Sequence, residues 1–397
     1  MRLDALLGTV HSNIWKLGVI KALRWFMLFM PTMVLFFQEN GLSMQDILLL
    51  QSIFSVAVII FEIPSGYFSD VIGRKTTIVL ACICSFFGFS LYVFSYSFTG
   101  FLIAELVIGL GSSFLSGTDS ALLYDSLLQT NRESEFTKLE GRMLAIGNFS
   151  ESIAALLGGV LALSSLRLPF VGMSILVFLS IPVALLLVEP KRKKFEAHDN
   201  PVKEVMRIVR FGLHEHGALK WLIIYSGFVG ASTLTMVWFI QPYLVSGGLP
   251  LAYFGIAWAL LNASVGFFSL GAHKIEAFFG RRTSLVMLMP LVALAYLVTA
   301  LSNAYWAVAF LFIFYLVRGI SNPVLTDYVN RLTSSDMRAT ILSVKNLFGR
   351  IVFAIVGPFI GWAADAYSLS VAFIASGAIF LLLGLLSLFF LQKHTSI

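Results

Sequence analysis

The chain has 397 residues, of which 58% are hydrophobic and only 12% are charged. Because soluble domains carry roughly a quarter charged residues, this composition excludes a soluble globular protein. The formal net charge of +6 is typical of a membrane protein whose basic residues collect in cytoplasmic loops, so we expect no nucleic-acid partner. The two cysteines, Cys82 and Cys84, share one apolar run, and we expect both to be packing residues.

Apolar runs of about 20 residues recur along the chain, each long enough to cross a hydrocarbon layer of about 30 Å as a helix. The runs are continuously apolar, whereas barrel strands alternate over about ten residues. The sequence therefore predicts an all-α integral membrane protein with twelve transmembrane helices in two pseudo-symmetric six-helix halves. The expected spans lie near 18–38, 46–68, 76–96, 100–123, 140–163, 169–188, 219–244, 251–275, 283–301, 304–328, 340–363 and 369–391.

These spans predict an N-terminal half over 1–188, a cytoplasmic linker over 189–218 and a C-terminal half over 219–397. Within the linker, apolar residues at helical spacing over 202–213 predict an amphipathic helix on the inner membrane surface; a solvated linker is the alternative. Lys and Arg gather in the loops on the side of both termini. By the positive-inside rule, we expect a multi-pass protein of the cell inner membrane with both termini cytoplasmic.

One polar motif occurs twice, as GYFSDVIGRKTT at 66–77 and as HKIEAFFGRRTS at 273–284. Other identities between the halves follow in the same order, which predicts two six-helix repeats of parallel topology. The paired positions are Gln38 and Gln241, Gly73-Arg74 and Gly280-Arg281, Thr118-Asp119 and Thr326-Asp327, Asn148 and Asn346, and Gly159 and Gly357.

The first copy of the motif follows the second span and matches the pattern G-x-x-x-D-x-x-G-R-K at Gly66, Asp70, Gly73, Arg74 and Lys75. With twelve spans in two halves, this motif resembles the signature loop of the major facilitator superfamily of secondary transporters. The second copy departs from the pattern, because His273 and Ala277 replace its first Gly and its Asp.

The resemblance implies that this loop latches the cytoplasmic side of the transporter shut when the opposite side is open. Asp125, at the end of the fourth span, has the expected depth to pair with Arg74. We interpret the five motif residues and Asp125 as a gate. The alternative is that Arg74 and Lys75 are only topology signals.

Two charges lie near the membrane midplane: Glu151, about eleven residues into the fifth span, and Arg350, about ten into the eleventh. Charged side chains at this depth cost roughly 2.5–3.5 kcal/mol on insertion scales. The resemblance implies that substrate and coupling ions bind near the midplane, so Glu151 is our candidate for proton coupling. A static ion pair that holds helices together is the alternative.

The fourth span carries Glu105, Gly109, Ser112, Ser116 and Asp119 at steps of three and four residues, which predicts one polar face. Close packing through small residues would explain the Gly and Ser but not the acids. We therefore add Asp119 and Glu105 to the proton-coupling candidates, with Arg24 as a candidate partner of Asp119.

The candidates for substrate binding are polar and aromatic residues on spans that the resemblance assigns to a central cavity or that lie near the midplane. They are Arg350, Arg24, Arg318, Asn148, Asn346, Asn322, Tyr315, Trp238 and Gln241.

The sequence contains no phosphate-binding loop and no hydrolase or metalloprotease motif, so we expect no enzyme, no cofactor and no metal. We expect a monomer in the lipid bilayer that moves a small organic solute by alternating access, with protons as coupling ion. Drug or amphiphile antiport is the first hypothesis. The alternatives are proton-linked transport of one anionic metabolite such as a siderophore, and a non-transporting receptor or lipid-handling scaffold.

Overall fold

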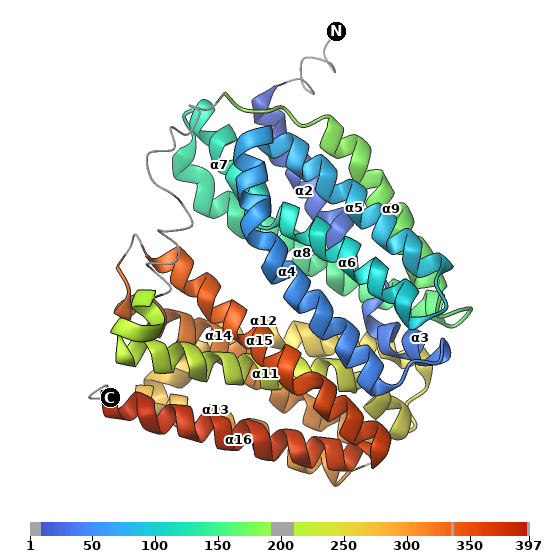
Figure 1. Ribbon diagram of the computed structural model, residues 1–397, viewed down its shortest axis with the longest axis vertical. Helices are drawn as coiled ribbons and strands as arrows, with labels where there is room; N and C mark the ends of the chain where they lie inside the picture. Colours follow the sequence, from blue (N-terminus) through green and yellow to red (C-terminus); the bar gives the residue numbers. More distant parts are fainter. Residues whose placement is uncertain (1–8, 192–209, 303, 335–336, 395–397) are drawn as a thin grey trace. The chain divides into compact units, whose positions relative to one another are not determined.

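The computed structural model describes residues 9–191, 210–302, 304–334 and 337–394, and the regular elements of this part are all helices (Figure 1). The longer ones are α2 Asn13–Trp25, α3 Met33–Glu39, α4 Met44–Ile72, α5 Arg74–Phe94, α6 Phe98–Leu115, α7 Thr118–Gln129, α8 Phe136–Ala162, α9 Leu168–Leu185, α11 Gly217–Ser246, α12 Phe254–Phe279, α13 Arg281–Ala300, α14 Val308–Leu332, α15 Arg338–Ala366 and α16 Leu369–His394. By length and composition, 12 segments of the described chain can cross a membrane. The predicted all-helical architecture is therefore confirmed. Most of the expected amphipathic helix at 202–213 lies outside the described residues.

Two compact units make up the chain. Unit 1 comprises Met1–Gly41, Ile53–Glu196 and Leu251–Ala259, and unit 2 comprises Leu42–Ser52, Ala197–Pro250 and Leu260–Ile397. The start of α4 thus belongs to unit 2 and the rest of that helix to unit 1. Helix α12, by contrast, starts in unit 1 and continues in unit 2. The expected boundary between two halves within the linker stays a prediction.

Two of the expected continuous spans are interrupted. In the first, α2 ends at Trp25 and α3 begins at Met33 after a short turn that contains Pro31, a residue without a backbone N–H to donate. In the fourth, Gly117 adopts a left-handed conformation with φ of 73° and separates α6 from α7. The polar face predicted from Glu105 to Asp119 is therefore wrong, because the break turns Asp119 away from the α6 register.

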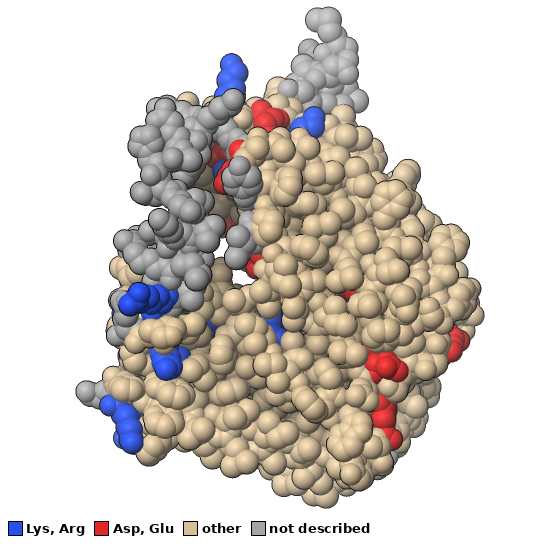
Figure 2. Space-filling model, viewed as in Figure 1, with Lys and Arg blue, Asp and Glu red and all other residues tan. Residues whose placement is uncertain are grey.

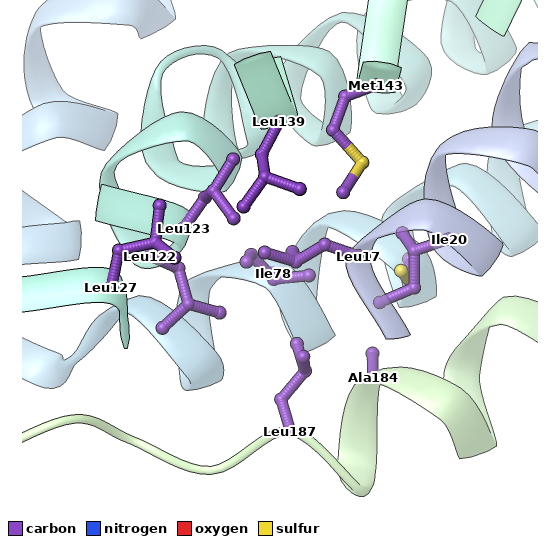
Figure 3. Packing of buried hydrophobic residues seen from close by; sticks show 11 residues of the cluster. Leu17, Ile20, Ile78, Leu122, Leu123, Leu127, Leu139, Met143, Ala184 and Leu187 are labelled. Carbon is purple, nitrogen blue, oxygen red and sulfur yellow. The ribbon is translucent and has the colours of Figure 1, made fainter. Parts of the chain in front are cut away.

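A core of apolar side chains joins five helices of unit 1 (Figure 3). Leu17, Ile78, Leu122, Leu139 and Ala184 come from α2, α5, α7, α8 and α9, respectively, and all are at most 5% exposed. Since lipid tails are as apolar as leucine, dense packing rather than escape from water holds such helices together.

Glycines allow the closest helix contacts within unit 1. A Cβ atom on Gly158 of α8 would lie 1.8 Å from the carbonyl oxygen of Leu28. Where α8 meets the start of α12, a Cβ atom on Gly255 would lie 2.3 Å from the carbonyl oxygen of Ala155. Backbone therefore packs on backbone at both places, as small residues permit in membrane proteins.

Large apolar side chains cover the outer surface. Phe149, Phe267 and Phe359 are 71%, 74% and 69% exposed, and the face drawn in Figure 2 shows charged residues in only a few places. Such a surface would aggregate in water, whereas a hydrocarbon layer solvates it.

Candidate functional site

The signature loop is tied together by two carboxylates of unit 1. Asp125 of α7 forms an ion pair with Arg74, with 2.8 Å between the carboxylate and Nη1, and the same guanidinium donates to the carbonyl oxygen of Ala121. This is the contact expected from the sequence. Both residues belong to unit 1, however, so separation of two halves cannot by itself break the pair; within unit 1 it fixes the motif against α7.

Glu189, which follows the sixth span, is a further partner of the signature loop, and sequence reasoning missed it. Its carboxylate accepts hydrogen bonds from the backbone N–H groups of Arg74 at 2.9 Å and Lys75 at 2.7 Å. Gly73, with φ of 104°, lies against the same carboxylate. Glu189 thus satisfies two of the free donors at the start of α5. The sequence offered one signal for this role, because Glu189 directly follows a span that ends on the same side of the membrane as the motif.

Replacement of Glu189 by Ala should loosen this loop. Loss of a helix cap costs about 0.5–2 kcal/mol, so the loop should open about fivefold more often and trypsin should cut faster after Arg74 or Lys75. Limited proteolysis followed by mass spectrometry measures the rate. Glu133→Ala, at an exposed carboxylate at the start of the fifth span, is the control, and an unchanged rate for Glu189→Ala would refute the capping role.

The second copy of the motif keeps the backbone of the first but not its partners. Gly280 precedes α13 with φ of 78°, as Gly73 precedes α5 with φ of 104°. Glu276 lies 3.7 Å from Arg281 and accepts a hydrogen bond of 2.7 Å from the Tyr328 hydroxyl. The displaced acid therefore pairs with Arg281 beside it and with Tyr328 on α14, the helix that the repeat aligns with α7.

Asp119 pairs with Lys21 of α2, at 3.3 Å. Both side chains are only partly exposed, at 23% and 17%, and both lie within membrane-spanning segments. Arg24, expected as the partner, instead donates to the Ala81 carbonyl at 2.9 Å and to the Ser85 hydroxyl at 2.6 Å on α5. The expected pairing of Arg24 with Asp119 is therefore wrong.

Glu105 lies in the interior of unit 1 and is 3% exposed. It accepts a hydrogen bond of 2.6 Å from the Tyr92 hydroxyl, and Tyr92 stacks on Phe101 and Phe170. A carboxyl enclosed in this way lacks the contact with water that a proton carrier needs.

The candidates for substrate binding differ in how far their side chains are exposed. Asn148, Arg318, Asn322, Asn346 and Arg350 are exposed although they lie within membrane-spanning segments. Gln241 and Tyr315 are each 2% exposed. The indole Nε1 of Trp238 is buried and has no hydrogen-bond partner among the described residues.

Glu151 of α8 is partly exposed, one turn beyond the exposed Asn148. It belongs to unit 1 and Arg350 to unit 2. The proposed pairing of the two charges therefore stays a prediction.

Unit 2 contains two charged contacts without a counterpart in the sequence predictions. Lys345 of α15 is 7% exposed and donates to the Thr326 hydroxyl of α14 at 2.8 Å. At the opposite end of α15, the carboxylate of Asp365 accepts hydrogen bonds from the backbone N–H groups of Met44 at 3.0 Å and Gln45 at 2.7 Å. Asp365 therefore caps the start of α4, and the positive end of a helix favours such an anion.

Relatives with curated descriptions cover most of the chain. The MFS-type transporter YxaM of Bacillus subtilis (strain 168) is 24% identical over 374 residues, 90% of each chain. The tetracycline resistance protein, class H, of Pasteurella multocida is 22% identical over 91% of this chain and 90% of its own. The quinolone resistance protein NorA of Staphylococcus aureus (strain N315) is 20% identical over 82% of this chain and 84% of its own.

Solved transporters share the fold. The nucleoside transporter NupG superposes with a TM-score of 0.75 at 14% identity, over 96% of this chain and 98% of NupG. The D-xylose-proton symporter gives a TM-score of 0.73 at 16% identity, over 97% of each chain. The sequence pattern of the Major Facilitator Superfamily matches residues 18–356. With its twelve candidate spans, this chain belongs to the Major Facilitator Superfamily and is a membrane transporter, not an enzyme.

Proposed function

We propose that this transporter exports a small amphiphilic organic solute in exchange for protons, by alternating access across the cell inner membrane. The observation that carries the proposal is the set of polar residues exposed in mid-span, among them Asn148, Arg318 and Arg350. Lipid does not tolerate guanidinium and amide groups at that depth, so these residues face a path that water can enter. The relatives named for tetracycline and quinolone resistance support export.

In this mechanism Glu151 takes up a proton when its surroundings open to one side and releases it when they open to the other. Solute and proton then occupy the transporter alternately, and the proton gradient drives the solute outward. Asp119, which forms an ion pair with Lys21, is the second candidate carrier. The excess of Lys and Arg on one side of the spans supports cytoplasmic termini.

The test uses everted membrane vesicles that contain the protein, energised by respiration and followed with a pH-sensitive dye. Addition of an amphiphilic substrate should make the lumen more alkaline, and Glu151→Gln should abolish this response. Glu133→Gln, at an exposed carboxylate near the start of the same span, should retain it. A full response in Glu151→Gln would remove Glu151 from the mechanism. No response to any compound, with folded protein in the membrane, would favour the receptor or scaffold.

A second candidate function is transport of one specific anionic metabolite. It is favoured by the exposed guanidinium groups of Arg318 and Arg350, which have no acidic partner among the described residues.

A further inference from the structure

Helix α15 has two exposed faces of opposite character. Ile355, Phe359 and Trp362 are 61%, 69% and 48% exposed, and Asn346 and Arg350 are exposed as well. At 3.6 residues per turn, the polar face is rotated by roughly 170° from the apolar face. Lipid solvates the apolar face, so the polar face on the opposite side of the helix does not face lipid.

The neighbouring helix α14 presents a matching pair. Within 310–330, the exposed residues are Arg318 and Asn322, which are four apart and therefore lie on one face of the helix. An Arg and an Asn one turn apart thus occur on both helices. Asn precedes Arg on α15 and follows it on α14.

The hydrogen bond of 2.8 Å between Lys345 and Thr326 aligns the two helices. From that contact, Asn346 and Arg350 lie about 2 and 8 Å along α15, and Asn322 and Arg318 lie about 6 and 12 Å back along α14, at ~1.5 Å per residue. The four groups therefore occupy a band about 10 Å deep in unit 2. The long Arg side chains can converge within such a band.

This band is too deep for contact with lipid headgroups. Arg318 lies at the centre of the span Tyr305–Leu332, and Arg350 lies ten residues, about 15 Å, beyond the start of the span Thr340–Ala366. Neither Arg has an acidic partner among the described residues. Uncompensated guanidinium groups at mid-depth need an anion or water.

We propose that Arg318, Asn322, Asn346 and Arg350 bind an anionic group of the transported solute, a carboxylate or a phosphate. The inference rests on the proposed transport function and specifies the substrate class as an organic anion. Each guanidinium can donate two parallel hydrogen bonds to such a group, and the two amides add donors. Lys345, one residue from Asn346, increases the positive field.

The first test measures local attraction for anions and needs no known substrate. Cys82 and Cys84, the two cysteines of the chain, are replaced by Ala, and Asn346→Cys serves as reporter, with Asn322→Cys as a second. The anionic sulfonatoethyl and the cationic trimethylammonioethyl methanethiosulfonates are compared by reaction rate. Ile355→Cys, on the apolar face of the same helix, is the control and should react with neither.

Relative to their rates with a free thiol, the anionic reagent should react at least about tenfold faster than the cationic one, since one positive charge roughly 6 Å away, at an effective dielectric constant of about 80, attracts the first and repels the second and together gives that factor. Arg350→Gln or Arg318→Gln should lower the ratio about tenfold, whereas Arg350→Lys should largely keep it. Equal rates for the two reagents, each divided by that reagent's rate with a free thiol, would overturn the proposal. So would unreactive cysteines at both Asn positions, which would show that the band faces lipid.

A second test separates this inference from proton-coupled export. The vesicle assay is repeated with naphthoate, its neutral methyl ester and the cation naphthylmethylammonium. Responses to the ester or the cation but not to naphthoate would overturn the anion site and leave proton-coupled export in place. An anion preference at the reporters, with no dye response to any of the three, would support the site and count against proton coupling.

Discussion

Gly158→Ala should leave little folded protein in the membrane. The added Cβ atom would lie 1.8 Å from the carbonyl oxygen of Leu28 and 2.7 Å from its carbonyl carbon. Ordinary overpacking costs about 1–3 kcal/mol because side chains move aside. Here the obstacle is backbone, so α8 and the segment after α2 must separate, and the cost should exceed that range.

Fluorescence-detected size-exclusion chromatography measures the amount of monodisperse protein. Gly266→Ala on α12 is the matched control, because nothing lies within 4 Å of its added Cβ atom. Since Ala favours a helix by about 0.8–1 kcal/mol over Gly, the control should be at least as stable as wild type. Wild-type yield and melting temperature for Gly158→Ala would contradict the packing described for unit 1.

Lys21→Met should destabilise the protein strongly, and Asp119→Asn should restore it. The single change leaves the Asp119 carboxylate without its cation inside a membrane-spanning segment, at a cost of about 2.5–3.5 kcal/mol on insertion scales. The double variant removes both charges, which is often close to neutral. Melting temperatures of the two single variants and the double variant form the thermodynamic cycle.

The same variants distinguish a purely structural role of the Lys21–Asp119 pair from a role of Asp119 in proton coupling. If Asp119 carries the proton, the double variant should be stable yet fail to acidify or alkalinise vesicles when substrate is added. Recovery of both stability and the dye response would show that the pair only holds α2 to α7. Additive effects of the two changes would show that the 3.3 Å contact contributes little.

The overall fold follows from the sequence because hydropathy records directly which segments can enter lipid. Interruptions within a span are less visible. Ser116 and Gly117 fit an apolar helix by composition, and only the left-handed φ of Gly117 shows that α7 starts anew. Asp119, which lies beyond that break, was therefore assigned to the wrong face.

Side-chain partners in the candidate site were predictable only where the motif supplied one member of the pair. Arg74 and Asp125 were paired correctly on depth alone. Lys21 and Arg24 are three residues apart on one helix, so periodicity cannot say which reaches Asp119; the rotation of α7 decides it. Glu189 and Asp365 act through backbone N–H groups, which side-chain pairing rules do not predict; only the position of Glu189 directly after a span offered a signal.

The cap on α4 also imposes a delay during synthesis. Met44 and Asp365 are 321 residues apart, and a ribosome that adds about 5–20 residues per second needs roughly 16–64 s to make the stretch between them. Throughout that time the first N–H groups of α4 lack their native acceptor, and water or lipid headgroups must serve instead. The N-terminal helices therefore enter the membrane early, but their second span reaches its native end only after the eleventh has been made.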